Sequence, residues 1–200
     1  MPTTSRGRRT RAQLITGARA AFEKNGYLDT RVVDIAAEAD VSYGTFYTYF
    51  SSREEIFEEV VEALLADFQA IARAEPFLGE SPAARIERAN RGYLRAYRKN
   101  ARMMAVLEQA ATFTDILRDV RRGIRGYWVD RSRNAIARWQ HDGLIDTSID
   151  PYYAATSLGA MVNRSAYVWM VLGEPYDEDQ AVAQLTLLYC RALGLQLHDD

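Results

Sequence analysis

The sequence predicts an all-α protein with two helical domains. Along most of its 200 residues, apolar side chains recur at the three- and four-residue spacing of helices, and no segment sustains the alternation of a strand. Capping residues and Gly or Pro stops divide this pattern into about nine helices. With 48% hydrophobic and 26% charged residues, the composition excludes a disordered or collagen-like chain.

Local signals place the first four helices. An apolar stripe predicts a first helix over about residues 9–25, and Asn25-Gly26 supplies its stop. Thr30 is expected to cap a short second helix, and Ser42 a short third one. The Ser52–Glu55 segment matches a capping box, which would open a long fourth helix.

Five further helices are expected in the rest of the chain. Ser81-Pro82 is typical of a helix start, because the missing N–H of proline costs little there. Asp150 is a candidate cap, and Gly143 and Gly173 are candidate stops. One predicted helix begins at Ser81-Pro82. The other four cover about residues 100–111, 114–141, 151–172 and 177–193.

The segment from Thr30 to Arg53 is the most informative. Two short helices joined by Ala39-Asp40-Val41 predict a helix-turn-helix at about residues 31–50, whose second helix enters the DNA major groove. At 100° per residue, Gly44 and Thr48 point away from the core. A solvated helix normally carries Lys, Glu or Gln outward, so a face of Gly, Thr and Tyr favours contact with DNA.

These residues resemble the DNA-binding domain of the TetR family of bacterial transcriptional regulators. The resemblance covers about residues 8–68 and rests on Ala20-Ala21-Phe22, Asn25-Gly26-Tyr27, Asp34-Ile35-Ala36, Val41-Ser42, Gly44-Thr45-Phe46-Tyr47 and Tyr49-Phe50. It implies backbone contacts from Thr30 and Arg31, base contacts from Tyr43, Gly44, Thr45 and Thr48, and phosphate contacts from Ser42, Tyr47, Tyr49 and Arg53. Arg53 replaces the lysine usual in the family, which changes the donor geometry. For Tyr43 and Tyr49, packing at the core edge is the alternative.

The net charge of −2 conceals four blocks of opposite sign. Residues 1–53 carry +3, residues 54–81 carry −7, residues 82–142 carry +8 and residues 143–200 carry −6. Residues 1–7 are expected to form a basic arm, which either seeks phosphates or only keeps the protein in solution. Because the DNA-binding end is only weakly positive, we expect hydroxyls, amides and helix termini to carry much of the backbone contact.

The region of residues 75–200 is expected to bind a ligand and form a homodimer, as the resemblance implies. A dimer is also what a palindromic operator in double-stranded DNA requires. Two apolar helix faces are candidates for the interface, the alternative being that they form the internal core of one chain. Their residues are Leu158, Met161, Val162, Trp169, Val182, Leu185, Leu188 and Tyr189.

Soft and aromatic residues of the same region are candidates for the walls of an effector pocket, although each could instead belong to the core. They are Tyr93, Met103, Met104, Leu107, Phe113, Tyr127, Trp128, Asn163, Tyr167 and Met170. Asn163 is the sharpest candidate, because an amide among apolar neighbours must find a partner.

The arginines of the +8 block have two interpretations. They either pair with the acidic fourth helix, Glu54–Glu62, or receive an anionic effector with an apolar tail, for example an acyl-coenzyme A. Arg85, Arg88, Arg95 and Arg98 share one helix face, and Arg121 and Arg122 are the candidate ligand contacts.

Other classes of protein have little support. The single Cys190 permits no intrachain disulfide, and no secretory signal or membrane span is evident, so we expect a cytoplasmic protein. His141 and His198 lie far apart, and no metal, phosphate-loop or nucleophile-elbow motif occurs, so no metal, cofactor or catalysis is predicted. The preferred hypothesis is a ligand-responsive repressor. An activator of the same fold and a helical small-molecule binder that does not act on DNA are the alternatives.

Overall fold

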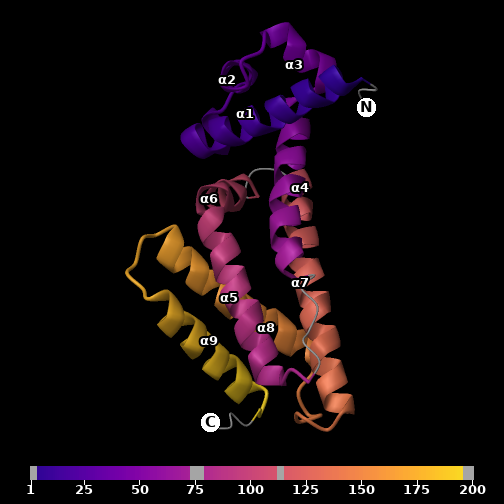
Figure 1. Ribbon diagram of the computed structural model, residues 1–200, viewed down its shortest axis with the longest axis vertical. Helices are drawn as coiled ribbons and strands as arrows, with labels where there is room; N and C mark the ends of the chain where they lie inside the picture. The colour runs from indigo at the N-terminus through magenta and orange to yellow at the C-terminus, as the bar shows by residue number, and fades with distance from the viewer. Residues whose placement is uncertain (1–3, 73–78, 112–114, 196–200) are drawn as a thin grey trace. The chain divides into compact units, whose positions relative to one another are not determined.

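The computed structural model describes residues 4–72, 79–111 and 115–195. Within these ranges the chain forms only helices (Figure 1): α1 (Ser5–Asp29), α2 (Val32–Glu38), α3 (Tyr43–Tyr49), α4 (Arg53–Ala72), α5 (Pro82–Lys99), α6 (Ala101–Ala110), α7 (Asp115–His141), α8 (Pro151–Met170) and α9 (Glu178–Ala192). The all-α prediction is confirmed. Among the described helices, none is both long enough and apolar enough to cross a bilayer.

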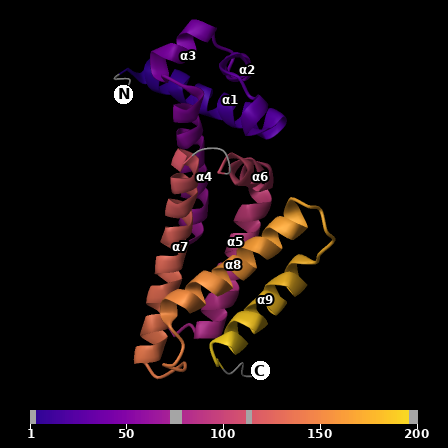
Figure 2. The same ribbon diagram turned by 180° about the vertical axis from the view of Figure 1, so that it is seen from behind.

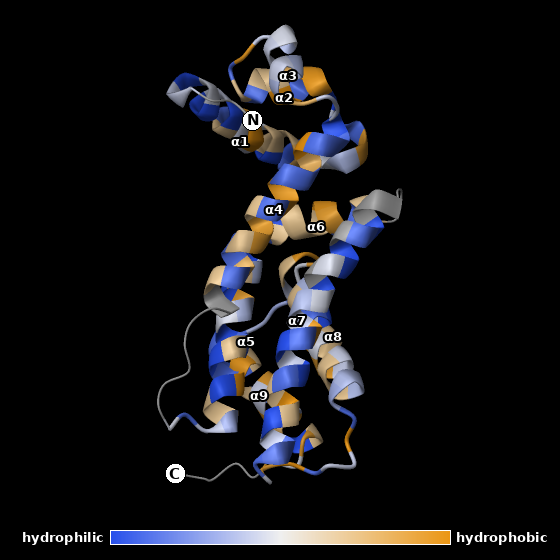
Figure 3. Ribbon diagram, turned by 90° about the vertical axis from the view of Figure 1, so that its right-hand side faces the viewer, coloured by the Kyte–Doolittle hydropathy of each residue, from blue (hydrophilic) through white to orange (hydrophobic). Residues whose placement is uncertain are grey.

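The helices form two compact units. Unit 1 comprises residues 1–67 and 102–121, and unit 2 comprises residues 68–101 and 122–200. The first division, within α4, lies close to the end of the predicted DNA-binding domain. The sequence did not predict that α6 belongs to unit 1, because nothing in its apolar pattern says which helices it packs against. Figure 3 shows the apolar character of α6 and the hydrophilic surface of much of α5.

Unit 1 is built around an aromatic core. The Phe57 ring packs edge-on against Phe22 and Tyr27, with centroid separations of 4.9 and 4.7 Å. Phe46 brings α3 onto the same core and is fully buried, as are Leu14 and Ile35 of α1 and α2. Burial of these side chains fixes the orientation of α3 within unit 1.

In unit 2, α5 packs against α9 and α8 (Figure 2). Its buried face includes Leu94 and Tyr97, and the α9 residues opposite include Val182 and Leu185. The one buried polar contact described between α5 and α9 is satisfied, since Asn90 Nδ2 donates to Thr186 Oγ1 at 3.2 Å.

Most predicted helix ends are confirmed. Ser42, Ser81 and Asp150 each accept a backbone N–H of their own helix. Gly26, Gly143 and Gly173 adopt φ values of 79°, 71° and 80°, as left-handed stops require.

Three helix starts differ from prediction. α1 begins at Ser5 rather than near residue 9, because Thr4 accepts the Gly7 N–H at 3.1 Å, so Arg6 lies in a helix and not in an arm. Arg31, not Thr30, is the N-cap residue of α2. Ser52 caps α4 as expected, but the Glu55 carboxylate accepts from Ser51 rather than closing the box on Ser52.

Gly17 permits the closest approach between α1 and the helix-turn-helix. A Cβ at this position would lie 2.6 Å from the Ala39 nitrogen and 2.7 Å from the Ala39 Cβ. Both atoms belong to the turn after α2 and cannot rotate away, so only glycine fits between the helices.

We therefore expect Gly17→Ala to lower the free energy of unfolding by about 1–3 kcal/mol, the usual cost of overpacking a core. Gly44→Ala is the control, because no atom lies within 4 Å of its added Cβ. Thermal or urea unfolding measures both. An unchanged midpoint for Gly17→Ala would show that the turn can move away from α1.

Candidate nucleic-acid interface

Helices α2 and α3 form the predicted helix-turn-helix. The turn between them runs through Asp40, whose φ of 52° is left-handed, a conformation that Asp tolerates better than most residues. The Val41 N–H then donates to the Ala36 carbonyl at 3.0 Å, which closes the turn. These local contacts define the turn that connects α2 to α3.

The outward face of α3 is the one that helical geometry predicts. Phe46 is fully buried, whereas Gly44 and Thr48 are exposed. The space beyond Gly44 is open, so the backbone itself is accessible there. A base edge in a major groove could therefore approach α3 closely at this position.

The hydroxyls at the start of α3 are held by its cap. Ser42 Oγ accepts the Thr45 N–H at 3.1 Å and lies 2.8 Å from Thr45 Oγ1. Thr48 Oγ1 points back to the Gly44 carbonyl at 3.4 Å, a long bond that a better acceptor can replace.

Two tyrosines act as a pair on the exposed side of α3. Tyr43 and Tyr47 are 52% and 48% exposed, and their hydroxyls lie 3.1 Å apart. Tyr43 therefore does not belong to the core edge, whereas Tyr49 is half-buried. The hydrogen bond between the two hydroxyls raises the pKa of Tyr47. A tyrosine hydroxyl is protonated at neutral pH in any case, so it can donate to a phosphate oxygen.

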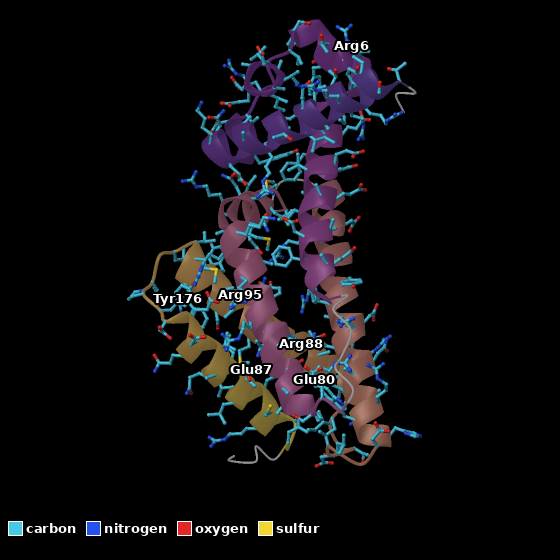
Figure 4. All side chains as sticks on the ribbon, viewed as in Figure 1. Arg6, Glu80, Glu87, Arg88, Arg95 and Tyr176 are labelled. Carbon is cyan, nitrogen blue, oxygen red and sulfur yellow. The ribbon has the colours of Figure 1, made fainter. Side chains whose placement is uncertain are left out.

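Cationic side chains surround α3 but are absent from it. The Arg31 guanidinium binds Asp34 at 3.3 Å and its side chain is 76% exposed. Arg11 lies over the Phe50 ring, which brings the start of α1 beside the end of α3 (Figure 1). Arg6 is exposed one to two turns earlier on α1 (Figure 4).

Thr30 and Arg53, both predicted to contact the DNA backbone, have partners inside unit 1. Thr30 is fully buried, and its hydroxyl donates to the carbonyls of Gly26 and Ala21. Arg53 Nη1 donates to the carbonyls of Tyr27, Leu28 and Thr30 at 3.1–3.3 Å, and Nε and Nη2 donate to Glu54. Both side chains are therefore used inside unit 1, where they satisfy the carbonyls at the end of α1.

Gln109 is a residue of this site that sequence reasoning missed. Its Oε1 accepts the Tyr27 N–H at 3.3 Å, directly after the left-handed Gly26. Gly26 and Gln109 also line an open hollow of about 410 Å³. The signal in the sequence was Gly26 itself, since a helix stop leaves backbone groups that need a partner. We call the segment 26–30, with Arg53 and Gln109, the α1 junction.

Comparison with known proteins identifies the DNA-binding domain. The family described as "Bacterial regulatory proteins, tetR family" matches residues 14–60, which contain the helix-turn-helix. Residues 14–60 are accordingly a TetR-type DNA-binding domain. Over most of its length the chain is similar to the HTH-type transcriptional regulator TtgR of Pseudomonas putida, which is 26% identical over 184 residues, covering 88% of this chain and 87% of that protein.

Solved structures show the same fold. A TetR-family regulator from Rhodococcus sp. superposes with a TM-score of 0.80 at 24% identity, covering 92% of this chain and 98% of that one. AibR, whose structure contains isovaleryl coenzyme A and operator DNA, has a TM-score of 0.70 at 22% identity, covering 90% and 97%. The agreement in structure includes the region after residue 60, where the match to the TetR family model ends.

The predicted pocket residues separate into two groups. Met103, Met104 and Leu107 are buried in unit 1, and Phe113 lies outside the described residues. The remaining six lie in unit 2: Tyr93, Tyr127, Trp128, Asn163, Tyr167 and Met170.

An aromatic cluster in unit 2 contains the predicted amide. Asn163 Nδ2 donates to the Tyr93 hydroxyl at 2.8 Å, so the expectation that Asn163 needs a partner is confirmed. The Tyr93 ring contacts Trp128 and Phe68, with centroids 5.9 and 5.5 Å apart. The cluster combines apolar walls with one polar pair, the composition of small-molecule sites.

The ion pairs described for four arginines of α5 are with carboxylates other than Glu54–Glu62, the partners that the first interpretation held. These arginines pair with carboxylates of unit 2: Arg88 with Glu80, Arg91 with Glu87 and Asp179, and Arg95 and Arg98 with Glu178. Arg121 binds Glu108 within unit 1, and Arg122 is exposed. Among the described side chains, no group of three or more His, Cys, Asp or Glu could hold a metal ion.

Half of the predicted dimer residues are buried within one chain. Val162, Val182, Leu185 and Tyr189 are at most 8% exposed, and α5 packs against both of the helices that carry them, α8 and α9. The idea that one subunit cannot bury them is therefore wrong. Leu188 is 52% exposed, and Leu158, Met161 and Trp169 are half-buried.

The α1 junction predicts that Arg53→Gln lowers the free energy of unfolding by about 1–3 kcal/mol, because a charged donor to three carbonyls is lost. Arg31→Gln is the control, since this exposed arginine serves one surface pair. Chemical denaturation checks both variants. If Arg53→Gln kept wild-type stability and lost only DNA affinity, Arg53 would be a phosphate contact after all.

Proposed function

We propose that this chain is a homodimeric repressor that binds a palindromic operator through α3 and leaves it when a small molecule binds unit 2. The observation that carries the proposal is the outward face of α3, an exposed, uncharged surface of glycine, threonine and tyrosine on a helix-turn-helix. Repression of bacterial genes would take place in the cytoplasm. An activator would make the same DNA contacts, and would differ from a repressor only in where its operator lies relative to the promoter.

The proposed DNA contacts divide by chemistry. Thr48 and the open backbone at Gly44 would face base edges, and the Tyr43–Tyr47 pair would donate to phosphates. Thr45, Ser42 and the half-buried Tyr49 would contribute further contacts. Because the helix carries no cation, most of its affinity would come from hydrogen bonds and fit rather than from counterion release.

The proposed dimer uses the part of α8 and α9 that one chain leaves uncovered. Leu172 and Leu188 are 57% and 52% exposed, and Leu158, Met161 and Trp169 retain accessible surface. Burial of such apolar area against a second copy stabilises an interface by about 25 cal/mol per Å². Two copies would then present two α3 helices to successive major grooves.

The proposed effector is an apolar or aromatic small molecule, which would contact the cluster of Tyr93, Trp128 and Asn163. The Asn163–Tyr93 hydrogen bond gives such a ligand a polar group to replace or extend. AibR binds an acyl-coenzyme A, and an acyl chain would suit the same aromatic walls. Arg121 and Arg122 would contact an anionic part of the effector, and Arg121 would have to leave Glu108 to do so.

The effector would act by shifting a balance between conformations. A ligand changes DNA affinity only by as much as it prefers one conformation over the other. α6 follows α5 after the single residue Asn100, and Gln109 of α6 holds the α1 junction. A displacement of α5 would therefore reach the helices that carry α3.

The decisive experiment is a fluorescence anisotropy titration of the full chain with duplexes from the DNA flanking its own coding sequence and with scrambled duplexes of equal length. Tighter binding to one flanking duplex, lost on adding an effector, is the expected result. Equal affinity for all duplexes would reject sequence-specific regulation and favour a helical small-molecule binder.

Within α3 we expect two different defects. Tyr47→Phe should weaken binding to all duplexes about equally, because a phosphate donor is lost. Thr48→Ala should lose about 1–3 kcal/mol of preference for the operator over variants with one changed base pair. Titrations against a panel of operator variants separate the two. A uniform loss in Thr48→Ala would assign that side chain to the DNA backbone.

Leu188→Glu should convert the dimer to a monomer at micromolar concentration, because a charge would enter an apolar interface. The matched control is Leu144→Glu, which alters a leucine of similar exposure (49%) outside α8 and α9. Sedimentation velocity measures the oligomeric state. A dimer that survived Leu188→Glu unchanged would show that another surface joins the subunits.

A further inference from the structure

The arginines of α5 are neutralised along most of the helix but not at its N-terminal end. Arg91, Arg95 and Arg98 each have an acidic partner on α9. Figure 4 shows Arg95 near Tyr176 in this region, and Arg88 beside Glu80 towards the other end of the helix. Arg85, three residues before Arg88, has no ion pair among the described residues.

Three more guanidiniums share the environment of Arg85. Arg138 and Arg131 of α7 and Arg88 of α5 are close enough for their charges to act on it. Arg131 and Arg138 are seven residues apart and therefore lie on one face of α7. Neither has an ion pair in the part of the chain that the structure describes.

The packing of α5 against α7 explains why these residues meet. The Tyr93–Trp128 ring contact, at 5.9 Å, sets the register of the two helices. From this contact, α5 runs back to Arg85 while α7 runs forward to Arg131 and Arg138, since the helices are antiparallel (Figures 1 and 2). Arg85 and Arg88 of α5 therefore lie towards the same end of the helix pair as Arg131 and Arg138 of α7.

Glu80 acts on Arg85, but it is already engaged. It accepts from Arg88 Nε and Nη2, both at 2.8 Å, and its side chain is 7% exposed. Counted over the described residues named here, Arg85, Arg88, Arg131 and Arg138 against Glu80, the group has a surplus of three positive charges. Such a cluster repels itself and is relieved by an anion.

The burial and the pKa of Arg85 are consistent with this surplus of positive charge. Its side chain is half-buried, and desolvation, followed by the charges of Arg138 and Arg131, lowers its pKa. A guanidinium that is partly removed from water and surrounded by like charges is costly unless a counter-ion binds.

We propose that Arg85, Arg131 and Arg138, with Arg88 as a support, form a binding site for a phosphate-bearing small molecule with about three negative charges, such as a pyrophosphate group. The planar fork of arginine matches phosphate oxygens in pairs, and three forks from two helices surround one group. The site goes beyond the proposed function, because it requires neither DNA binding nor the aromatic cluster.

Isothermal titration calorimetry of the full chain with sodium pyrophosphate, at constant ionic strength, tests the site. We expect saturable binding to the wild type and at least a tenfold weaker Kd in Arg85→Gln/Arg131→Gln. Arg95→Gln is the control on the same helix, because its side chain is 65% exposed and pairs with Glu178. Its Kd should stay within twofold of the wild-type value.

Thermal unfolding provides a second readout that loss of folding cannot imitate. Without pyrophosphate, Arg85→Gln should raise the Tm, because a repelled and partly buried charge is removed. With pyrophosphate, the same variant should gain less stability than the wild type. No saturable binding to the wild type, equal binding to the double variant, or an equal loss in Arg95→Gln would overturn the proposal. Any of these outcomes leaves the operator titration, and with it the regulator function, unaffected.

Discussion

The α1 junction is the constraint on which the rest of the DNA-binding unit depends. α1 is kinked at the left-handed Gly26, three residues before its end at Asp29, and the carbonyls and amide released there must be satisfied inside the unit. Arg53 of α4, the Thr30 hydroxyl and Gln109 of α6 satisfy them. The segment 26–30 thus connects α1 to α2 and is bound by side chains of α4 and α6. We infer that the position of α3 depends on these contacts.

The sequence was sufficient wherever a local interaction decides the structure. The stop at Gly26, the Ser42 cap and the Pro82 start depend on neighbours three or four residues away, and all three lie as predicted. The outward face of α3 was predictable for the same reason, because a seven-residue helix with Phe46 buried leaves one orientation for Gly44. The spacing of apolar residues predicted which face of α3 is exposed, but it did not predict the contacts of the α1 junction.

Tertiary packing decided what the sequence could not show. Arg53 was predicted to contact a phosphate, and no pattern in the sequence indicated that its long, forked side chain also donates to the carbonyls of Tyr27 and Thr30, more than twenty residues earlier. The partners of the α5 arginines lie about 80 to 90 residues away on α9, beyond the reach of any periodic pattern. For the same reason Val182 looked like interface and is core, since the covering helix was unknown.

We propose that the α1 junction holds the helix-turn-helix in the conformation that binds an operator. The operator affinity of Gln109→Ala, compared with Gln109→Glu, tests it most directly, because the glutamate keeps an oxygen to accept the Tyr27 N–H. The account predicts about a tenfold or greater loss of operator affinity in Gln109→Ala, faster hydrogen exchange at the Tyr27 amide, and a smaller effect of Gln109→Glu. Wild-type operator affinity in Gln109→Ala, with the Tyr27 amide exchanging freely, would contradict it.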